Sequence, residues 1–586
     1  MGQTIIQKIL EKHSDGKANV DDIIDVNIDV RVARDFGGAN VIKNLEENGL
    51  PIHAPEKTYF TFDCNPGGCD QQYATNQHIC RLFARRNGIK VFDIERGIGT
   101  HIAIDEGIAK PGGTIVSTDS HANILGAIGA FGQGMGDNDI AHAFAYGRVW
   151  FKVPQTVKLI LKGTPSEFAT PKDIVLKMLQ QLGANGLLGY AAEVYGDYVD
   201  SLSLDGRITI ASMATEMGGI IILFPSENVT ADDNAKYERT VNIDIDGLRP
   251  QVSRPGHPED VVDASGVKGT KIDSGFIGSC TNGRMEDMIV AAKILKGRKV
   301  APGRVLKIVP ATDNIWKQCL HEGLIKIFKD AGALVGSGGC AGCAAGQIGQ
   351  TGKDEVSLSS GNRNFTGKQG EGDIFLASPA TVAASLVAGF ITTTDEIPGK
   401  PGLFNVPAAK RSIAQSKDKP VVQPLRVEGR AWVIKKDNID TDMIFHNRYL
   451  SITNIHEMGP YAFGNLKGYE NFAKEAKKGD IVIVGKNFGC GSSRQQAVDC
   501  FKSLGIGVIV AESFGAIYER NAINSAMPIL IADNLVNAVN DGDIISVDFM
   551  TGEIRNKTQG KSYQAKPFSR VQIEIYQRGG LLLPAR

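Results

Sequence analysis

Residues 275–288 read GFIGSCTNGRMEDM: an apolar run ends at Cys280 and leads through a Gly/Asn turn into a helical pattern. An apolar strand followed directly by a turn and a helix is the repeating unit of α/β proteins, whose sheets are mainly parallel. Similar strand and turn patterns recur through the first four hundred residues, at 58–63 (TYFTFD), 90–94 (KVFDI), 112–121 (GGTIVSTDSH), 304–312 (RVLKIVPAT) and 372–379 (GDIFLASP). We therefore predict an α/β fold.

The chain is also predicted to divide into domains. Its 586 residues exceed the roughly 250–300 that one hydrophobic core supports. Residues 398–424 are rich in Pro, Lys and Ser and show no periodicity, which favours an extended connector. We predict a catalytic core at 1–400, a linker at 401–428 and a separate α/β domain at 429–586, whose strands are RAWVI, DIVIVG, IGVIVA and PILIA.

Composition and charge argue against several classes of function. The 64 basic and 65 acidic residues leave a net charge of −1, so we expect no nucleic-acid partner and no anionic membrane partner. No apolar run approaches the roughly 18 residues of a membrane span. Residues 1–16 read as an amphipathic helix without a signal-peptide pattern, so we expect a cytoplasmic protein. In that reducing compartment, the nine cysteines point to metal or redox chemistry.

Three cysteines form the strongest chemical signal. Cys280 ends an apolar strand, and Cys340 and Cys343 form a CxxC within the Gly/Ala-rich stretch GALVGSGGCAGCAAGQ. A CxxC alone is also compatible with half of a structural zinc site or with a redox pair. No fourth ligand lies at zinc-site spacing, and a redox CxxC normally opens a helix. Three thiolates would leave one iron of a cluster with open coordination, as a Lewis-acid catalyst requires.

Five segments, in order along the chain, resemble the aconitase superfamily, which includes isopropylmalate dehydratase and homoaconitase. They are STDSHANILGAIGAFGQGMG, FIGSCTNGR, GGCAGC, SSGNRNFTGKQG and GKNFGCGSSRQQA. The resemblance implies three α/β domains around a [4Fe–4S] cluster held by Cys280, Cys340 and Cys343. It also implies a fourth, swivelling domain, here joined to the core in one chain, so that the large and small parts of the family are fused.

The implied activity is that of a hydro-lyase, which removes and adds water across a C–C bond of a hydroxy-carboxylic acid. We predict Ser492, in GCGSSR, as the base for the C–H proton, because backbone N–H groups at a helix start and Arg494 could lower its pKa. Ser493 and Arg494 are predicted to bind substrate. The alternatives are that both serines cap the helix, or that they form a serine-hydrolase elbow, although G-x-S-x-G is absent.

Further site residues are predicted from the other motifs. Asp119 and His121 are predicted as catalytic residues and Ser120 as a substrate-binding residue, because all three follow the strand TIVST at the sheet edge where α/β proteins bind ligands. Asn362 and Arg363 are expected to bind a substrate carboxylate, Arg363 through its planar fork. Glu216, in ITIASMATEMGG, resembles the carboxylate that the family places beside its cluster. The competing interpretation is a solvated glutamate on a helix.

The chain departs from the family pattern at several positions. An Asp-His pair of the family is replaced by Asp63 and Cys64, and Thr100 stands where a histidine is usual, with His101 one residue later. Asp63 and His101 are retained as predicted catalytic residues, although a one-residue shift in an extended segment points to the opposite face. Lys368 stands where the family has a substrate-binding arginine, so a single ammonium charge replaces the two-pronged guanidinium, and Lys368 is predicted to bind substrate.

The last departure concerns the substrate. The segment NIDTDMIFHNRYLSITN resembles the specificity loop of the small domain, and Ser451 stands where an arginine marks relatives that bind an extra carboxylate. We therefore predict a malate-type substrate, such as isopropylmalate or an alkylmalate, with Ser451 in its binding site. Aconitate hydratase activity and a non-catalytic RNA-binding or iron-sensing role remain as alternatives. The sequence leaves the oligomeric state open.

Overall fold

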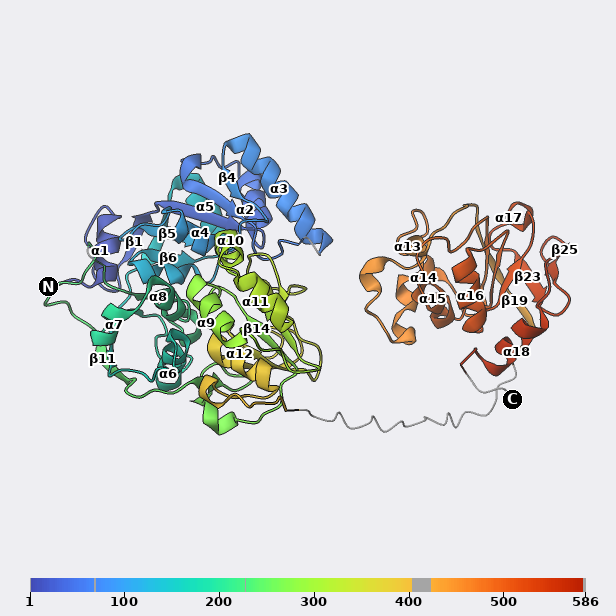
Figure 1. Ribbon diagram of the computed structural model, residues 1–586. Helices are drawn as coiled ribbons and strands as arrows, with labels where there is room; N and C mark the ends of the chain where they lie inside the picture. Colours follow the sequence, from blue (N-terminus) through green and yellow to red (C-terminus); the bar gives the residue numbers. More distant parts are fainter. Residues whose placement is uncertain (1, 68–69, 227, 403–422, 583–586) are drawn as a thin grey trace. The chain divides into compact units, whose positions relative to one another are not determined.

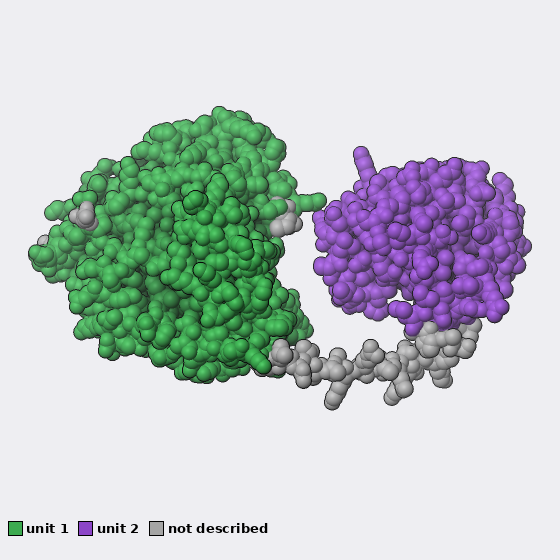
Figure 2. All heavy atoms as spheres, in the orientation of Figure 1, with its two compact units in different colours: residues 1–409 green, residues 410–586 purple. Residues whose placement is uncertain are grey.

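The computed structural model describes residues 2–67, 70–226, 228–402 and 423–582 (Figure 1). The chain separates into two compact units, residues 1–409 and residues 410–586, which Figure 2 colours green and purple. Most of the predicted linker, residues 403–422, lies outside the described residues. Among the described residues, no helix is both long enough and apolar enough to cross a membrane.

The first sheet of unit 1 is wholly parallel and carries many of the catalytic candidates. Its strand order is β4 (Lys90–Phe92), β3 (Thr58–Thr61), β2 (Val30–Arg34), β5 (Thr114–Ser117) and β6 (Phe131–Gly134). β2 is buried along its whole length, although its sequence VRVAR includes two arginines, Arg31 and Arg34. The helices of this part are α2 (Gly38–Glu47), α3 (Gln71–Asn87), α4 (Gly99–Asp105) and α5 (Asp137–Tyr146).

The second sheet of unit 1 has four strands and is also parallel. Its order is β10 (Ile221–Leu223), β9 (Ala191–Tyr195), β8 (Thr156–Lys162) and β11 (Arg239–Asp244). The accompanying helices are α6 (Pro171–Leu182), α7 (Asp197–Ser201) and α8 (Leu204–Ala211). α6 begins with a capping box, in which Thr170 and Asp173 satisfy backbone N–H groups at the helix start. α1 (Ile5–Lys12) and the antiparallel pair β1 (Ile23–Asn27) and β7 (Arg148–Lys152) complete the N-terminal region.

The third sheet of unit 1 holds the first cysteine segment. Its strand order is β13 (Val261–Asp263), β12 (Gln251–Ser253), β18 (Asp373–Ala377), β17 (Val356–Ser359), β14 (Ser274–Ile277), β15 (Val305–Ile308) and β16 (Leu334–Val335). The five strands from β18 to β16 are parallel, and β12 is antiparallel to β18. The nearby helices are α9 (Met285–Leu295), α10 (Asp313–His321), α11 (Leu324–Ala331) and α12 (Pro379–Ala388); α9 packs on α11 and α12 (Figure 1).

Unit 2 is built on one mixed sheet. Its order is β22 (Ile529–Ile531), β21 (Val508–Ala511), β20 (Ile481–Val484), β19 (Arg426–Ile434), β23 (Ile544–Asp548), β24 (Glu553–Asn556) and β25 (Lys561–Gln564). The first four strands are parallel and contain the predicted runs RAWVI, DIVIVG, IGVIVA and PILIA. Its helices are α13 (Thr441–Ile444), α14 (Phe472–Glu475), α15 (Gln496–Leu504), α16 (Ala516–Asn524), α17 (Leu535–Ala538) and α18 (Arg570–Arg578).

The predicted α/β class is confirmed in both units, and the sheets of unit 1 are mainly parallel, as predicted. Parallel strands place their carboxyl ends at one sheet edge, where α/β proteins bind ligands. Arg34 ends β2, Asp63 follows β3 and Asp119 follows β5, so the first sheet gathers three charged side chains at that edge. Cys280 follows β14 in the third sheet in the same way.

Candidate functional site

Two loops of the third sheet carry the three cysteines, and both contain strained backbone. Ser279, which precedes Cys280, has φ 71°, and Ala341, which follows Cys340, has φ 52°. Left-handed conformations at residues other than Gly cost of order 1–3 kcal/mol and concentrate at functional sites. Further partners hold the loops: the Cys340 N–H donates to the Asp63 carbonyl oxygen at 3.0 Å, and Cys343 ends a 3₁₀ turn, Ala341–Cys343.

The three thiols lie close enough to influence one another. A hydrogen bond links Cys340 and Cys343; it lowers the pKa of Cys343 and raises that of Cys340. Cys280 acts electrostatically on Cys343, and its Sγ donates to Asn362 Oδ1 at 3.3 Å. The CxxC and the distant Cys280 therefore converge through tertiary folding, as their spacing required.

A buried arginine joins two of the predicted catalytic carboxylates. Arg34 Nε donates to Asp63 Oδ1 at 2.7 Å, and Arg34 Nη1 lies 3.0 Å from Asp119 Oδ1. Burial raises the pKa of Asp63 to about 6, although Arg34 opposes the shift. Burial would also raise the pKa of Asp119, but the charges of Arg34 and His121 and the hydrogen bond from the His121 N–H together outweigh burial and leave that pKa below its usual value. The pair is therefore asymmetric, with one carboxyl much easier to protonate than the other.

The predicted histidine lies at the centre of a second set of charges. His121 Nε2 donates to Glu216 Oε1 at 3.2 Å, and Arg363 Nε donates to the same oxygen at 2.7 Å. The other ring nitrogen, Nδ1, is 3.4 Å from Ser120 Oγ. Burial alone would lower the pKa of His121, but the Cys280 sulfur and Glu216 raise it well above its usual value. Glu216 is buried and ion-paired, so the solvated alternative does not describe it.

Asp35, Asp63 and Cys64 form a compact buried group whose ligand atoms lie within 4.8 Å of one another. Asp35, however, is already occupied, because it accepts backbone N–H bonds from Asp63, Cys64 and Asn65 at 3.0–3.3 Å. Asp63 in turn is neutralised by Arg34. We interpret this group as the anchor of the 63–65 loop. Burial raises the pKa of Cys64 well above its usual value, so its thiol is protonated here.

His101 does not face the same groups as His121. It is fully buried on α4, its Nε2 donates to the Cys280 carbonyl oxygen at 3.0 Å, and burial lowers its pKa to about 3. A neutral imidazole in this position supports the Cys280 loop. The segment is a helix and not the extended chain assumed from the sequence, so the argument from opposite faces does not apply. Its predicted catalytic role stays a prediction.

Three further residues hold the loops that flank the thiols. Asn362 is fully buried and accepts hydrogen bonds from both Ser279 Oγ and Cys280 Sγ. Its side chain also donates to the Ser212 carbonyl oxygen, so it holds the Cys280 loop from the protein interior. Lys368 Nζ donates to the Cys343 carbonyl oxygen at 3.2 Å. Lys172, which the motifs did not indicate, is buried, and its Nζ donates to the Gly361 carbonyl oxygen at 2.9 Å.

The remaining predicted residues gather in unit 2. Thr441 Oγ1 donates to the Ser492 carbonyl oxygen at 3.0 Å, and Gln496 Nε2 donates to the Leu450 carbonyl oxygen, next to Ser451, at 3.2 Å. The serine loop and the predicted specificity loop therefore lie side by side. Ser451, Ser492 and Ser493 are exposed. Arg494 is buried and ion-paired with Asp442 at 2.6 Å, so its guanidinium has a structural partner.

The start of the helix after the serines differs from the prediction. α15 begins at Gln496 with Gln495 as its N-cap, so Ser492 neither starts nor caps the helix. The physical reason is the turn before it, in which Gly489 and Gly491 have φ 74° and 97°. These left-handed residues delay the helix and leave the serines in a loop. The capping alternative therefore fails, and the helix-start argument for a lowered serine pKa fails with it.

The residues present fit an iron–sulfur cluster. Three thiols converge, the pKa of Cys343 is lowered, and small neighbours such as Gly339 and Gly342 let the surrounding chain pack closely against the CxxC turn. One buried carboxylate oxygen, Glu216 Oε2, has no hydrogen-bond partner among the described residues. A buried orphan acceptor beside three thiols is what an added cationic group would satisfy.

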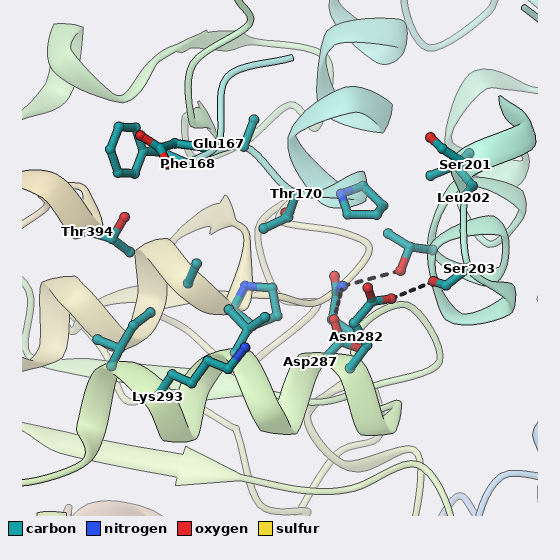
Figure 3. A pocket seen from close by; sticks show the side chains of 18 of the residues that line it. Glu167, Phe168, Thr170, Ser201, Leu202, Ser203, Asn282, Asp287, Lys293 and Thr394 are labelled. Atoms are coloured by element: carbon teal, nitrogen blue, oxygen red, sulfur yellow. Dashed lines mark hydrogen bonds between the residues drawn. The ribbon is translucent and has the colours of Figure 1, made fainter. Parts of the chain in front are cut away.

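A cavity of about 410 Å³ lies on another side of the Cys280 loop, between α6, α8, α9 and α12. Figure 3 shows Asn282, Asp287 and Ser203 at one end and Phe168 and Thr394 at the other. Asn282 Nδ2 donates to Asp287 Oδ1 at 2.9 Å, and burial raises the pKa of Asp287 to about 7. Among the described residues that line it there is no cysteine and none of the predicted site residues, so the cavity is separate from the thiol site.

The fold and the converging thiols define a multidomain α/β protein with a candidate metal–thiolate centre. Comparison with known proteins supports a more specific assignment. The aconitase family (aconitate hydratase) matches residues 7–232 and 263–389, and the aconitase C-terminal domain matches residues 427–534. The chain belongs to the aconitase family and is a hydro-lyase.

Relatives within the family carry different names. The chain is 36% identical to the homoaconitase large subunit of Thermus thermophilus over 413 residues, which cover 68% of this chain and 98% of the relative. It is 37% identical to a 3-isopropylmalate dehydratase large subunit of Archaeoglobus fulgidus, covering 68% and 100%. A solved structure of 3-isopropylmalate dehydratase from Methanocaldococcus jannaschii is 37% identical over 27% of this chain and 91% of its own, with a TM-score of 0.25.

Proposed function

We propose that this chain removes water from, and adds it to, a malate-type hydroxy-dicarboxylate by means of a [4Fe–4S] cluster on Cys280, Cys340 and Cys343. The observation that carries the proposal is the convergence of these thiols with His121, Glu216 and Arg363 in unit 1. The cluster, when bound, supplies a Lewis-acidic iron that polarises the substrate hydroxyl. The other groups that the reaction needs are side chains of this chain.

His121 is the proposed acid for the leaving hydroxyl. Its two ring nitrogens face Ser120 and Glu216, so the ring is held in one orientation and can carry a proton on either nitrogen. Asp119 holds the backbone of His121 in place, because Asp119 Oδ1 accepts a hydrogen bond from the His121 N–H at 3.0 Å. Asp63 and Arg34 form the adjacent charge pair. We propose that Asp63 assists proton transfer and that His101 supports the Cys280 loop.

Arg363 is the proposed carboxylate-binding residue of unit 1. Its Nε is used by Glu216, and its partly exposed guanidinium retains donors for a substrate carboxylate. Lys368 and Ser120 are proposed to bind substrate beside it. Asn362 was predicted to do the same, but its buried position favours a role in holding Cys280.

Unit 2 is proposed to supply the base and the substrate preference, so that one chain carries the parts that some relatives divide between subunits. Ser492 is the proposed base, with Ser493 as a substrate-binding neighbour. Ser451 is proposed to face the variable substituent of the substrate, because a short hydroxyl at this position offers no charge for a third carboxylate. Arg494 is proposed to hold the serine loop through Asp442.

A substrate panel on anaerobically reconstituted protein tests this proposal. Isopropylmalate, methylated malates, homocitrate and citrate are compared by the absorbance of the unsaturated acid. We expect a higher kcat/KM for the malate-type acids than for citrate. A clear preference for citrate would contradict the proposed substrate class but would leave the cluster assignment intact, and no turnover of any acid by cluster-loaded protein would contradict the reaction itself.

A further inference from the structure

A cavity of about 420 Å³ lies at the end of the first sheet opposite to the catalytic candidates. Its lining residues lie at the amino ends of β2 and β3. Arg34, Asp63 and Asp119 lie at the other end of the sheet, at or beyond the carboxyl ends of β2, β3 and β5. Its basic lining residues are Arg31, Lys57 and Arg148, with His53 beside them. The volume is in the range of small-molecule sites, about 300–1,000 Å³.

The buried member of this cavity is the guanidinium of Arg31, which has no acidic partner in the part of the chain that the structure describes. Arg31 is 1% exposed; its Nε donates to the Ala143 carbonyl oxygen at 3.2 Å and its Nη2 to the His53 carbonyl oxygen at 3.1 Å. Among the described residues, Nη1 has no hydrogen-bond partner. Burial lowers the pKa of Arg31, and the carboxylates of Glu56 and Asp29 only partly oppose that shift. An unpaired buried cation is costly, so an anion that reached it would be stabilised.

The one carboxylate that lines the cavity is already engaged. Asp29 Oδ2 lies 2.9 Å from His13 Nε2 and accepts from the Thr114 N–H at 3.1 Å. Its charge is therefore shared with His13. Lys57 and Arg148 are exposed at the rim, so the lining as a whole remains cationic.

The backbone around the cavity is shaped for close approach. Gly147 has φ 71°, and a Cβ there would lie 2.4 Å from His53 Cδ2 and 3.0 Å from Arg31 Nη2. Its neighbours are fixed by backbone hydrogen bonds, from the His53 N–H to the Phe144 carbonyl oxygen at 2.7 Å and from the Ile28 N–H to the Gly147 carbonyl oxygen at 2.8 Å. Only a residue without a side chain leaves the guanidinium room at this position.

From this geometry we infer a second ligand site in unit 1, which binds a small multivalent oxyanion between Arg31, Lys57 and Arg148. A planar guanidinium and flexible cationic side chains at the rim are the groups that recognise phosphate or carboxylate oxygens. A phosphate-bearing ligand and a polycarboxylate share this chemistry, and binding measurements distinguish the two. The inference is independent of the proposed reaction, because the site lies at the other end of β2 and contains no cysteine.

The test is calorimetric titration of the full-length protein with inorganic pyrophosphate and, separately, with propane-1,2,3-tricarboxylate. We expect saturable binding of at least one probe, weakened about tenfold or more by the double variant Lys57→Ala/Arg148→Ala. The matched control, Lys43→Ala/Arg86→Ala, removes two exposed cations from α2 and α3 outside the cavity and is expected to change the affinity less than about twofold.

All four substituted side chains are exposed, so both double variants are expected to fold; circular dichroism checks this. Binding of pyrophosphate alone that the cavity variant weakens would assign a phosphate-bearing ligand, and such weakened binding of the tricarboxylate alone would assign a carboxylate. Tricarboxylate binding that the cavity variant leaves unchanged belongs to the proposed substrate site. The inference is overturned if neither probe binds at up to about 10 mM, or if the cavity variant binds as tightly as the control variant.

Discussion

Arg34 shows most directly how single residues hold this site. Its guanidinium lies between Asp63 and Asp119, and all three side chains are almost fully buried. Removing one partner of a buried ion pair leaves an uncompensated charge, which is far more damaging than removing an exposed partner. Here two carboxylates would lose their cation together, so the effect on folding stability is large.

Replacing Arg34 with Met is therefore expected to lower the free energy of unfolding by about 3–5 kcal/mol. Lys326→Ala, which breaks an exposed pair with Asp330, is the control and is expected to change that free energy by less than about 1 kcal/mol. Urea denaturation of cluster-free protein measures both. Similar losses for the two variants would show that Arg34 does not neutralise the buried carboxylates.

The serines of unit 2 make a second residue-scale prediction. Ser492→Ala is expected to reduce kcat by about 10²–10⁴-fold at nearly unchanged KM, because it removes a proton acceptor. Ser493→Ala is expected mainly to raise KM, since that residue is proposed to bind substrate. Both side chains are exposed, so neither change should disturb folding. Steady-state kinetics at equal cluster content decide the assignment; an unaltered kcat in Ser492→Ala would exclude it as the base.

At this scale the sequence indicated residues within motifs better than residues outside them. Cys280, Cys340 and Cys343 could be selected because their residue type and neighbours restrict their chemistry. Arg34 and Lys172 were missed, since an arginine at a strand end and a lysine at the start of a helix have many ordinary roles. A weak signal existed for Arg34, which stands at the carboxyl end of a strand before a Gly-Gly turn.

At the scale of elements, the end of α1 is fastened to the first sheet by a titratable pair. His13 Nδ1 bonds to the Ile9 carbonyl oxygen at 2.8 Å, and Nε2 lies 2.9 Å from Asp29 Oδ2. The hydrogen bond that His13 donates to Asp29 raises the pKa of His13 above its ordinary value of 6.5, against burial and the nearby Lys12 charge. The protonated imidazole therefore binds α1 to the start of β2.

This pair gives the stability of unit 1 a pH dependence. Because the folded-state pKa of His13 is raised, its contribution is complete below about pH 6.5 and is lost as the pH rises through the folded-state value. Thermal unfolding between about pH 6 and pH 9 is expected to show a decline in melting temperature that His13→Gln makes shallower. The control is His257→Gln, which replaces an exposed histidine and is expected to leave the decline in melting temperature unchanged. An equally steep decline in His13→Gln would contradict the account.

Sheet elements were more predictable than helix starts. The strand runs of both units, including TIVST and DIVIVG, could be recognised because buried parallel strands are continuous apolar runs. The start of α15 could not, because the conformation of Gly489 and Gly491 depends on contacts with residues 439–441. Residue 101 lies on a helix for a similar reason: the Gly99 N–H donates to Asp63, a contact remote in sequence.

At the scale of the whole molecule, the two units have separate hydrophobic cores. Three large clusters of buried side chains belong to unit 1, and two belong to unit 2. Among the described residues, none of these clusters mixes side chains from both units. A segment with its own core is expected to fold independently.

Residues 1–402 and 423–586, produced as separate chains, are therefore each expected to unfold cooperatively. Mixing them at high concentration is expected to restore part of the hydro-lyase activity, because unit 2 is proposed to supply Ser492. The control is a mixture with a 423–586 chain that carries Ser492→Ala, which is expected to restore none. Full activity of residues 1–402 alone would contradict the proposed contribution of unit 2.

The central claim is that three cysteines hold a catalytic cluster, and metal analysis tests it most directly. Iron and acid-labile sulfide are measured in anaerobically reconstituted protein and in Cys343→Ser, together with activity; Cys319→Ser, at a buried cysteine of α10 whose Sγ lies 3.8 Å from Met285 Sδ, is the control. The account predicts about four irons per chain in the parent and the control, and loss of cluster and activity together in Cys343→Ser. Stoichiometric zinc without sulfide, or an undiminished cluster in Cys343→Ser, would contradict it.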